Sequence, residues 1–119
     1  MLWAVCWLVG CPKPAELSFE ADIAPVIAAR CVACHNPSKM EAGLDLSTDP
    51  YTALTQTHSS QGNYPLVTPG NHLESYAWHK LNGTQSLAGG SGTSMPLGSA
   101  WQADFIDVVG EWIDEGAAP

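Results

Sequence analysis

The spacing of apolar residues predicts a helix near each end of the folded part of the chain. Over residues 18–31, apolar side chains recur at helical spacing. Ser18 suits the N-cap of this helix, and Pro25 is tolerated only near its first turn. After Ser99, which suits a second N-cap, the chain carries a broad apolar stripe with acidic residues between its members. We expect this helix to end at Gly116.

Two shorter helices are expected in the middle of the chain. Asp49 and Pro50 begin the first, because proline suits the first helical position. Asn71 begins the second, and Glu74 three residues later completes a capping-box pattern. Gly83 is a natural stop for that helix. The apolar residues that give these two segments their helical spacing are Tyr51, Leu54, Leu73, Tyr76, Ala77 and Leu81.

The remaining segments are expected to be irregular. Residues 36–47 and 56–70 lack a clear period, and residues 82–103 contain no charged side chain. Gly-Gly-Ser-Gly at 89–92 predicts a flexible loop in this last segment, with Met95 in its middle. No segment alternates as a strand would, so the predicted class is all-α, with about four helices joined by long loops. Loops of this length in a small domain suggest that a bound group fills the centre.

Length and charge narrow the classes of function. A chain of 119 residues forms one domain with a modest core, and a cofactor commonly adds stability at this size. Lys and Arg number 4 and Asp and Glu number 12, which gives a formal charge of −8. Nucleic-acid binding needs many cationic side chains and is strongly disfavoured. An acidic chain instead favours a partner protein with a basic surface.

The first ten residues are predicted to be an export signal. Their apolar run is too short to span a bilayer, which needs about 20 apolar residues. The run ends in Leu-Val-Gly-Cys at Cys11, which resembles the lipobox of bacterial lipoproteins. That resemblance implies cleavage before Cys11 and a lipid on its thiol, although no basic residue precedes the run. We therefore expect a signal over 1–10, a tether over 11–17 and a folded domain over 18–119, held by lipid at a bacterial membrane outside the cytoplasm.

The motif that indicates chemistry is Cys-Val-Ala-Cys-His at 31–35. C-x-x-C-H is the attachment signature of c-type haem. The thiols of Cys31 and Cys34 form thioethers to the two vinyl groups on one porphyrin edge, and His35 then binds the iron from one face. The sequence therefore predicts one covalent haem c with His35 as the proximal ligand.

Two other readings of this motif have less support. A thioredoxin-like C-x-x-C lies where a strand meets a helix, and no strand is expected before Cys31. Structural zinc needs further ligands, and the remaining histidines are spaced wrongly for a known zinc finger. These histidines are His58, His72 and His79.

The second iron ligand is predicted to be Met95. Met1 belongs to the signal, and Met40 follows His35 too closely to reach the opposite haem face. Thioether sulfur is a common distal ligand and raises the reduction potential relative to a second histidine. The runners-up are His72 and His79, although a single histidine is more often a surface or capping residue. His58 is expected to be exposed.

Taken together, these stretches resemble class I monohaem cytochromes c, in particular the small cytochrome c domains common in planctomycetes and myxobacteria. The matching stretches beside the haem motif are Phe19–Ile27, Gly43–Ser47, Val67–Asn71 with Ser75, Met95-Pro96 and Trp112–Ala117. The resemblance implies an all-α cytochrome c fold, thioethers at Cys31 and Cys34, and His35 and Met95 as axial ligands. It also offers Leu44, Leu46, Trp101 and Trp112 as candidates for packing on the haem or between helices. Leu97 stands where family members often have a second proline after the methionine.

The expected function is electron transfer, because an iron with six ligands has no open position for a substrate. No catalytic set is recognisable, so we do not expect an enzyme. The acidic C-terminal helix is expected to steer a basic redox partner, and residues 82–103 to form a docking surface at the haem edge. If Met95 does not bind, a five-coordinate haem that binds a gas is the alternative. A zinc or disulfide domain without haem is a third possibility.

Overall fold

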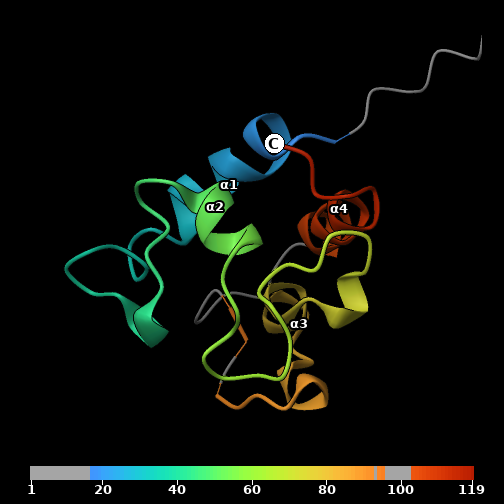
Figure 1. Cartoon of the computed structure of the whole chain (residues 1–119). Helices are drawn as coiled ribbons and strands as arrows, with labels where there is room; N and C mark the ends of the chain where they lie inside the picture. The colour runs from blue at the N-terminus through green and yellow to red at the C-terminus, as the bar shows by residue number, and fades with distance from the viewer. Residues whose placement is uncertain (1–16, 93, 96–102) are drawn as a thin grey trace, which may run out of the picture.

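A computed structural model describes residues 17–92, 94–95 and 103–119. Within these ranges the chain is helical, without a β-strand beyond an isolated bridge between His58 and Pro65. This confirms the predicted all-α class. The α-helices are α1 (Ala24–Arg30), α2 (Pro50–Thr55), α3 (Tyr76–Asn82) and α4 (Ala103–Asp114) (Figure 1). Shorter helical turns are η1 (Phe19–Ile23), η2 (Glu41–Gly43), η3 (His72–Glu74) and η4 (Gln85–Ala88). The predicted signal, Cys11, most of the tether, the Ser99 cap and Trp101 lie outside the described residues.

The first predicted helix has the expected ends but consists of two parts. The hydroxyl of Ser18 accepts a hydrogen bond from the N–H of Ala21 at 3.1 Å and caps the start. The first turn is π-helical, because the N–H of Ala24 donates to the carbonyl of Phe19, five residues back. Pro25 has no N–H to continue that pattern, and α1 begins here with the proline in its first turn. The spacing of apolar residues alone did not predict this change of register.

The helix at α2 forms as expected. Asp49 caps it by accepting a hydrogen bond from the N–H of Thr52 at 3.2 Å, and Pro50 occupies the first helical position. Leu54 is buried on the inner face and Tyr51 packs beside it against the core. This short helix is therefore specified by its cap and by its two apolar side chains.

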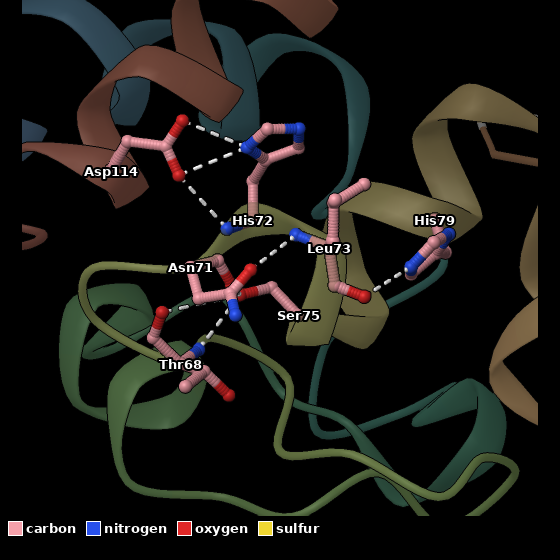
Figure 2. A network of polar contacts seen from close by, with 7 residues as sticks. All are labelled: Thr68, Asn71, His72, Leu73, Ser75, His79 and Asp114. Atoms are coloured by element: carbon pink, nitrogen blue, oxygen red, sulfur yellow. Dashed lines mark hydrogen bonds and ion pairs between the residues drawn. The ribbon is translucent and has the colours of Figure 1, made fainter.

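The helix predicted from Asn71 is interrupted. Asn71 caps only η3, where its side-chain oxygen accepts from the N–H of Leu73 at 3.1 Å. Ser75 then adopts an extended conformation, and its fully buried hydroxyl accepts from the N–H of Thr68 at 2.8 Å. The interruption changes the phase of the apolar residues, so Leu73 is 58% exposed although its spacing predicted a buried position. Figure 2 shows these polar contacts.

The uncharged segment after α3 is more ordered than its composition predicts. Gly83, at φ 76°, ends α3 as expected. The turn η4 follows, and its last residue, Ala88, is 1% exposed. The carbonyl of Ala88 accepts from the N–H of Asn63 at 2.8 Å, so contact with the preceding loop holds η4 in place. The prediction that this part of the chain is an irregular loop was therefore wrong for η4.

The core joins the two ends of the domain. The ring of Phe19 lies 5.4 Å from that of Tyr51 and 5.5 Å from that of Trp112, between centroids. The carbonyl of Ala118 accepts from the backbone N–H of Phe19 at 3.1 Å and from the indole N–H of Trp112 at 2.8 Å. In Figure 1 the red C-terminal segment accordingly returns to the blue N-terminal helix. Trp112 is 1% exposed, so it packs between helices as the sequence allowed.

Candidate functional site

The C-x-x-C-H motif forms a tight turn that continues from α1. The N–H of Cys31 donates to the carbonyl of Ile27 at 2.9 Å, as in the helix itself. The N–H groups of Cys34 and His35 both donate to the carbonyl of Cys31, at 3.2 and 3.0 Å. These bonds bring the two thiols and the imidazole onto one turn, because consecutive residues at a helix end have no freedom to separate.

Asn36, which the sequence analysis did not single out, braces this turn. Its side-chain N–H₂ donates to the carbonyls of Val32 at 2.7 Å and Ala33 at 3.1 Å. Its side-chain oxygen accepts from the backbone N–H groups of Ser38 and Lys39, both at 3.0 Å. One amide thus joins the carbonyls within the motif to the loop that follows it. Asparagine directly after the motif is a signal for such a turn, because its side chain bonds nearby backbone groups.

The imidazole of His35 is oriented by a backbone group. Its Nδ1 lies 3.1 Å from the carbonyl oxygen of Glu41. A carbonyl can only accept, so Nδ1 carries the hydrogen in this bond and the lone pair of Nε2 is left free. The N–H of Leu46, which is buried, donates to the carbonyl of His35 at 2.8 Å and fixes the backbone. The role of Glu41 belongs to its backbone, so no residue type in the sequence could reveal it.

The two cysteines suit covalent attachment. Both are free thiols and both are half-buried. Burial raises the pKa of Cys31, and the neighbouring Cys34 raises it further. The turn therefore offers two unpaired thiols and an imidazole whose Nε2 can bind a metal. This donor set fits a haem c: Cys31 and Cys34 would hold its edge and His35 its iron.

Met95 lies on a separate segment from this turn. Its side chain is half-buried, and its backbone N–H donates to the carbonyl of Lys80 in α3 at 2.9 Å. The described contacts thus tie Met95 to α3 rather than to the turn that carries His35. Met40, which the sequence analysis set aside, is 44% exposed.

His79 has hydrogen-bond partners that the sequence did not predict. His79 is only 5% exposed, so it is not one of the surface histidines that are common among single histidines. Its Nε2 donates to the carbonyl of Leu73 at 2.7 Å (Figure 2). Its Nδ1 lies 2.7 Å from the hydroxyl of Thr84. Both ring nitrogens of His79 are therefore engaged. His58 is exposed, as expected.

His72 is held against the end of α4. Its Nδ1 lies 2.8 and 2.9 Å from the two carboxylate oxygens of Asp114, and its backbone N–H donates to the same carboxylate at 3.0 Å (Figure 2). The ring also packs edge-on against Trp78, with centroids 4.6 Å apart. The two paired residues are 42 positions apart, so only the fold brings them together.

Acidic side chains collect along α4 beside this histidine. A shallow hollow of about 380 Å³ is lined by His72, Trp78, Asp107, Gly110, Glu111, Asp114 and Glu115. Asp107, Glu111, Asp114 and Glu115 are exposed. A Cβ at Gly110 would lie 3.0 Å from the indole nitrogen of Trp78, so a larger residue at this position would have to displace that ring slightly. Part of the chain's negative charge thus lies on an exposed face of α4 and the residue that follows it.

Neither a metal cluster nor a membrane span is found in the part of the chain that the structure describes. No group of three or more His, Cys, Asp or Glu side chains there could hold a metal ion, so those residues give no support to a zinc site. Over the same ranges, every helix is too short or too polar to cross a bilayer.

Comparison with known proteins identifies the domain. The profile of the family "Planctomycete cytochrome C" matches residues 31–89, from the first cysteine of the motif to Gly89, directly after η4. Among solved structures, a chain of Kuenenia stuttgartiensis hydrazine synthase superposes on 85% of this chain, with a TM-score of 0.54 and 25% sequence identity. This chain spans only 16% of the length of that chain. No curated protein matches the sequence.

The helical fold and these matches define a c-type cytochrome, a class that binds haem covalently and uses it for electron transfer. More particularly, the chain contains a planctomycete-type cytochrome c domain. Cytochrome c domains usually work outside the cytoplasm. The family match ends at residue 89, before Met95, so it does not extend to the predicted distal ligand.

Proposed function

We propose that this protein is an electron carrier with a single covalent haem, and that it is not itself an enzyme. Cys31 and Cys34 form the two thioethers, His35 binds the iron through Nε2, and Met95 is the distal ligand. When bound, the haem supplies an iron that alternates between Fe(II) and Fe(III). The observation that best supports this proposal is the 3.1 Å contact between Nδ1 of His35 and the carbonyl of Glu41, because it leaves Nε2 free for a metal.

The residues around His35 would tune the reduction potential. The carbonyl of Glu41 polarises the imidazole by accepting its hydrogen, which makes Nε2 a better donor to the iron. The hydrogen bond from the N–H of Leu46 keeps the backbone of His35 from shifting when the iron changes charge. Little movement on electron exchange is what a carrier needs.

Met95 is preferred over the two histidines as distal ligand because of what those side chains already bind. Ligation by His79 would break at least one of two hydrogen bonds inside the protein, at a buried position. The ring of His72 is held by Asp114 at Nδ1 and packed edge-on against Trp78 beside α4, so its Nε2 could bind the iron only if the iron lay beside α4. Met95 is half-buried, and its hydrogen bond to Lys80 is made by the backbone, so its thioether can turn toward the iron without breaking that bond.

Absorption spectra of protein made together with haem-attachment machinery test this assignment. We expect a c-type spectrum with the weak long-wavelength band of methionine sulfur on Fe(III). The band should disappear in Met95→Ala and persist in Met40→Ala, the matched control at an exposed methionine. A protein without haem contradicts the proposal as a whole.

Two other outcomes would identify a different iron site. Loss of the six-coordinate spectrum in His72→Gln or His79→Gln, with Met95→Ala unchanged, would make a histidine the distal ligand. Ready binding of CO by the reduced wild type would favour the five-coordinate, gas-binding alternative, because a bound Met95 blocks that position.

We further propose that the redox partner carries a basic surface that the acidic face of α4 attracts. Changing Asp104, Asp107 and Glu111 to their amides should slow electron transfer to such a partner at low salt. The difference should vanish near 1 M salt, where charges are screened within about 3 Å.

A matched control removes the same number of charges elsewhere. Glu20, Glu41 and Glu74 are exposed and lie outside α4. Their triple change to Gln should slow the reaction less than the change on α4. Equal slowing in both triple variants would show that only net charge matters and would contradict steering by α4.

We also propose that the chain is anchored by a lipid on Cys11, outside the cytoplasm. The lipobox-like sequence that ends at this residue supports the proposal. We expect the wild-type protein in the membrane fraction and Cys11→Ala in the soluble fraction, with mass spectrometry detecting the lipid on the N-terminal peptide. A wild-type peptide without lipid would contradict the anchor and leave the haem assignment unaffected.

A further inference from the structure

The residues around Met95 are tied to the helices by three hydrogen bonds. The carbonyl of Lys80, in α3, accepts from the N–H of Met95 at 2.9 Å. The ammonium of the same lysine donates to the carbonyl of Ser91 at 3.0 Å. The side-chain N–H₂ of Gln85, in η4, donates to the carbonyl of Gly92 at 2.8 Å. Two side chains thus hold the residues that lead to Met95.

Gln85 is an unusual residue to bury at this position. Gln85 is only 8% exposed, and its Oε1 has no hydrogen-bond partner in the described structure. A buried acceptor without a partner destabilises the fold, so a role for the other half of the amide is expected. The donor half makes the bond to Gly92, which is partly buried because Gln85 itself is buried although Gly92 is exposed.

Gly92 and Lys80 fit closely together. Gly92 has a φ of 81°, which favours glycine, and a Cβ there would lie 3.3 Å from the ammonium of Lys80. Desolvation lowers the pKa of Lys80, which reflects how closely its ammonium lies against this segment. The close contact therefore depends both on the long cationic side chain of Lys80 and on the absence of a side chain at Gly92.

We propose that Lys80 and Gln85 are positioning residues that keep Met95 on the iron by holding Ser91 and Gly92 in place. This inference rests on the proposed function, in which Met95 is the distal ligand. In this proposal Met95 leaves the iron together with a shift of Ser91 and Gly92, so each bond that holds these two residues lowers the population of the open form. Neither side chain is proposed to touch the haem.

Binding of imidazole to the oxidised holoprotein measures the open form directly. Imidazole can reach the iron only after Met95 has left, so its apparent affinity is proportional to the open fraction. In Gln85→Leu, which retains the volume and loses the donor, we expect imidazole to bind about fivefold more tightly. In Lys80→Met we expect about a twofold gain, because this bond is exposed to water. Gln56→Leu, at an exposed glutamine, is the matched control and should bind like the wild type.

A second background separates positioning from a general loss of stability. In Met95→Ala the ligand is already gone, so adding Gln85→Leu should leave the imidazole affinity unchanged. An equal gain with and without Met95 would overturn the proposal. So would an unchanged affinity in both Gln85→Leu and Lys80→Met. Should Gln85→Leu fail to fold, Lys80→Met alone still decides between these outcomes.

Failure of this inference is distinguishable from failure of the proposed function. If the wild type shows the methionine–iron band and the variants bind imidazole as it does, Met95 is the ligand and the positioning role is wrong. If Met95→Ala has the wild-type spectrum, Met95 is not the ligand, and both statements are wrong.

Discussion

The contact between Trp112 and the C-terminal segment offers the sharpest test of how the fold is held together. Trp112 is 1% exposed, packs on Phe19 and donates its indole N–H to the carbonyl of Ala118 at 2.8 Å. Trp112→Phe removes this bond and the outer ring of the indole. The carbonyl of Ala118 keeps a second donor, the N–H of Phe19, so it is not left unpaired. The lost bond therefore costs its net value, about 1 kcal/mol, rather than a full desolvation penalty.

The smaller ring adds a second contribution. About 40 Å² of apolar surface is lost from the core, which is worth about 1 kcal/mol. We expect Trp112→Phe to lower the free energy of unfolding by about 2 kcal/mol and the melting temperature by about 10 °C. Denaturant unfolding of the holoprotein, followed by circular dichroism, measures this change.

Tyr51→Phe provides the reference for the same region. It removes only the bond from the tyrosine hydroxyl to the carbonyl of Ala117 at 2.8 Å, so we expect a loss of about 1 kcal/mol. If Trp112→Phe cost no more than Tyr51→Phe, the joint contribution of packing and hydrogen bonding at Trp112 would be refuted.

Three further changes test other contacts. Ser75→Ala removes a fully buried hydroxyl that forms hydrogen bonds with two backbone groups. We expect urea unfolding to show a free energy of unfolding lower by about 2 kcal/mol, and a decrease below about 0.5 kcal/mol would contradict this role. Gly62→Ala places a Cβ 2.2 Å from Cδ2 of the buried Tyr76, so we expect a loss of at least about 2 kcal/mol, and near-neutral behaviour would show that the ring can shift. Burial raises the pKa of Asp114, but the hydrogen bonds and charge of His72 lower it by more, so the pKa lies below its usual value. A group with a lowered pKa stabilises the fold above its unfolded pKa of about 4, and this effect is lost as the pH falls through its folded pKa. We therefore expect Asp114→Asn to flatten the acid side of a plot of the free energy of unfolding against pH. An unchanged acid slope would count against the contact between His72 and Asp114.

Local sequence was enough to determine the helices that begin and end at strong signals. Ser18 and Asp49 cap their helices with their own side chains, and Gly83 ends α3 in the left-handed conformation. These contacts join residues only a few positions apart, so each could be predicted from its neighbours. The all-α class follows from the same signals together with the absence of strand alternation.

The haem motif is local for the same reason. Cys31, Cys34 and His35 lie within one turn, so their proximity is a property of the chain and needs no tertiary contact. The acidic stripe along the last helix was likewise readable, because helical spacing places its side chains on one face.

Tertiary structure decided everything that depends on residues distant in sequence. The hydroxyl of Ser75 bonds back to Thr68 and breaks a helix whose spacing looked continuous, which exposes Leu73. His72 meets Asp114 across the fold, and His79 is buried although single histidines are usually found at the surface.

The same holds for the three residues that act on the proposed iron ligands. The carbonyl of Glu41 orients His35, and a backbone group leaves no trace in residue type. Gln85 and Lys80 hold a segment that its glycine and serine content predicted to be flexible. Such a composition favours disorder only where no neighbouring side chain binds the backbone carbonyls. The sequence by itself thus determined which thiols we propose to hold the haem edge, and the fold determined what orients and restrains the groups around them.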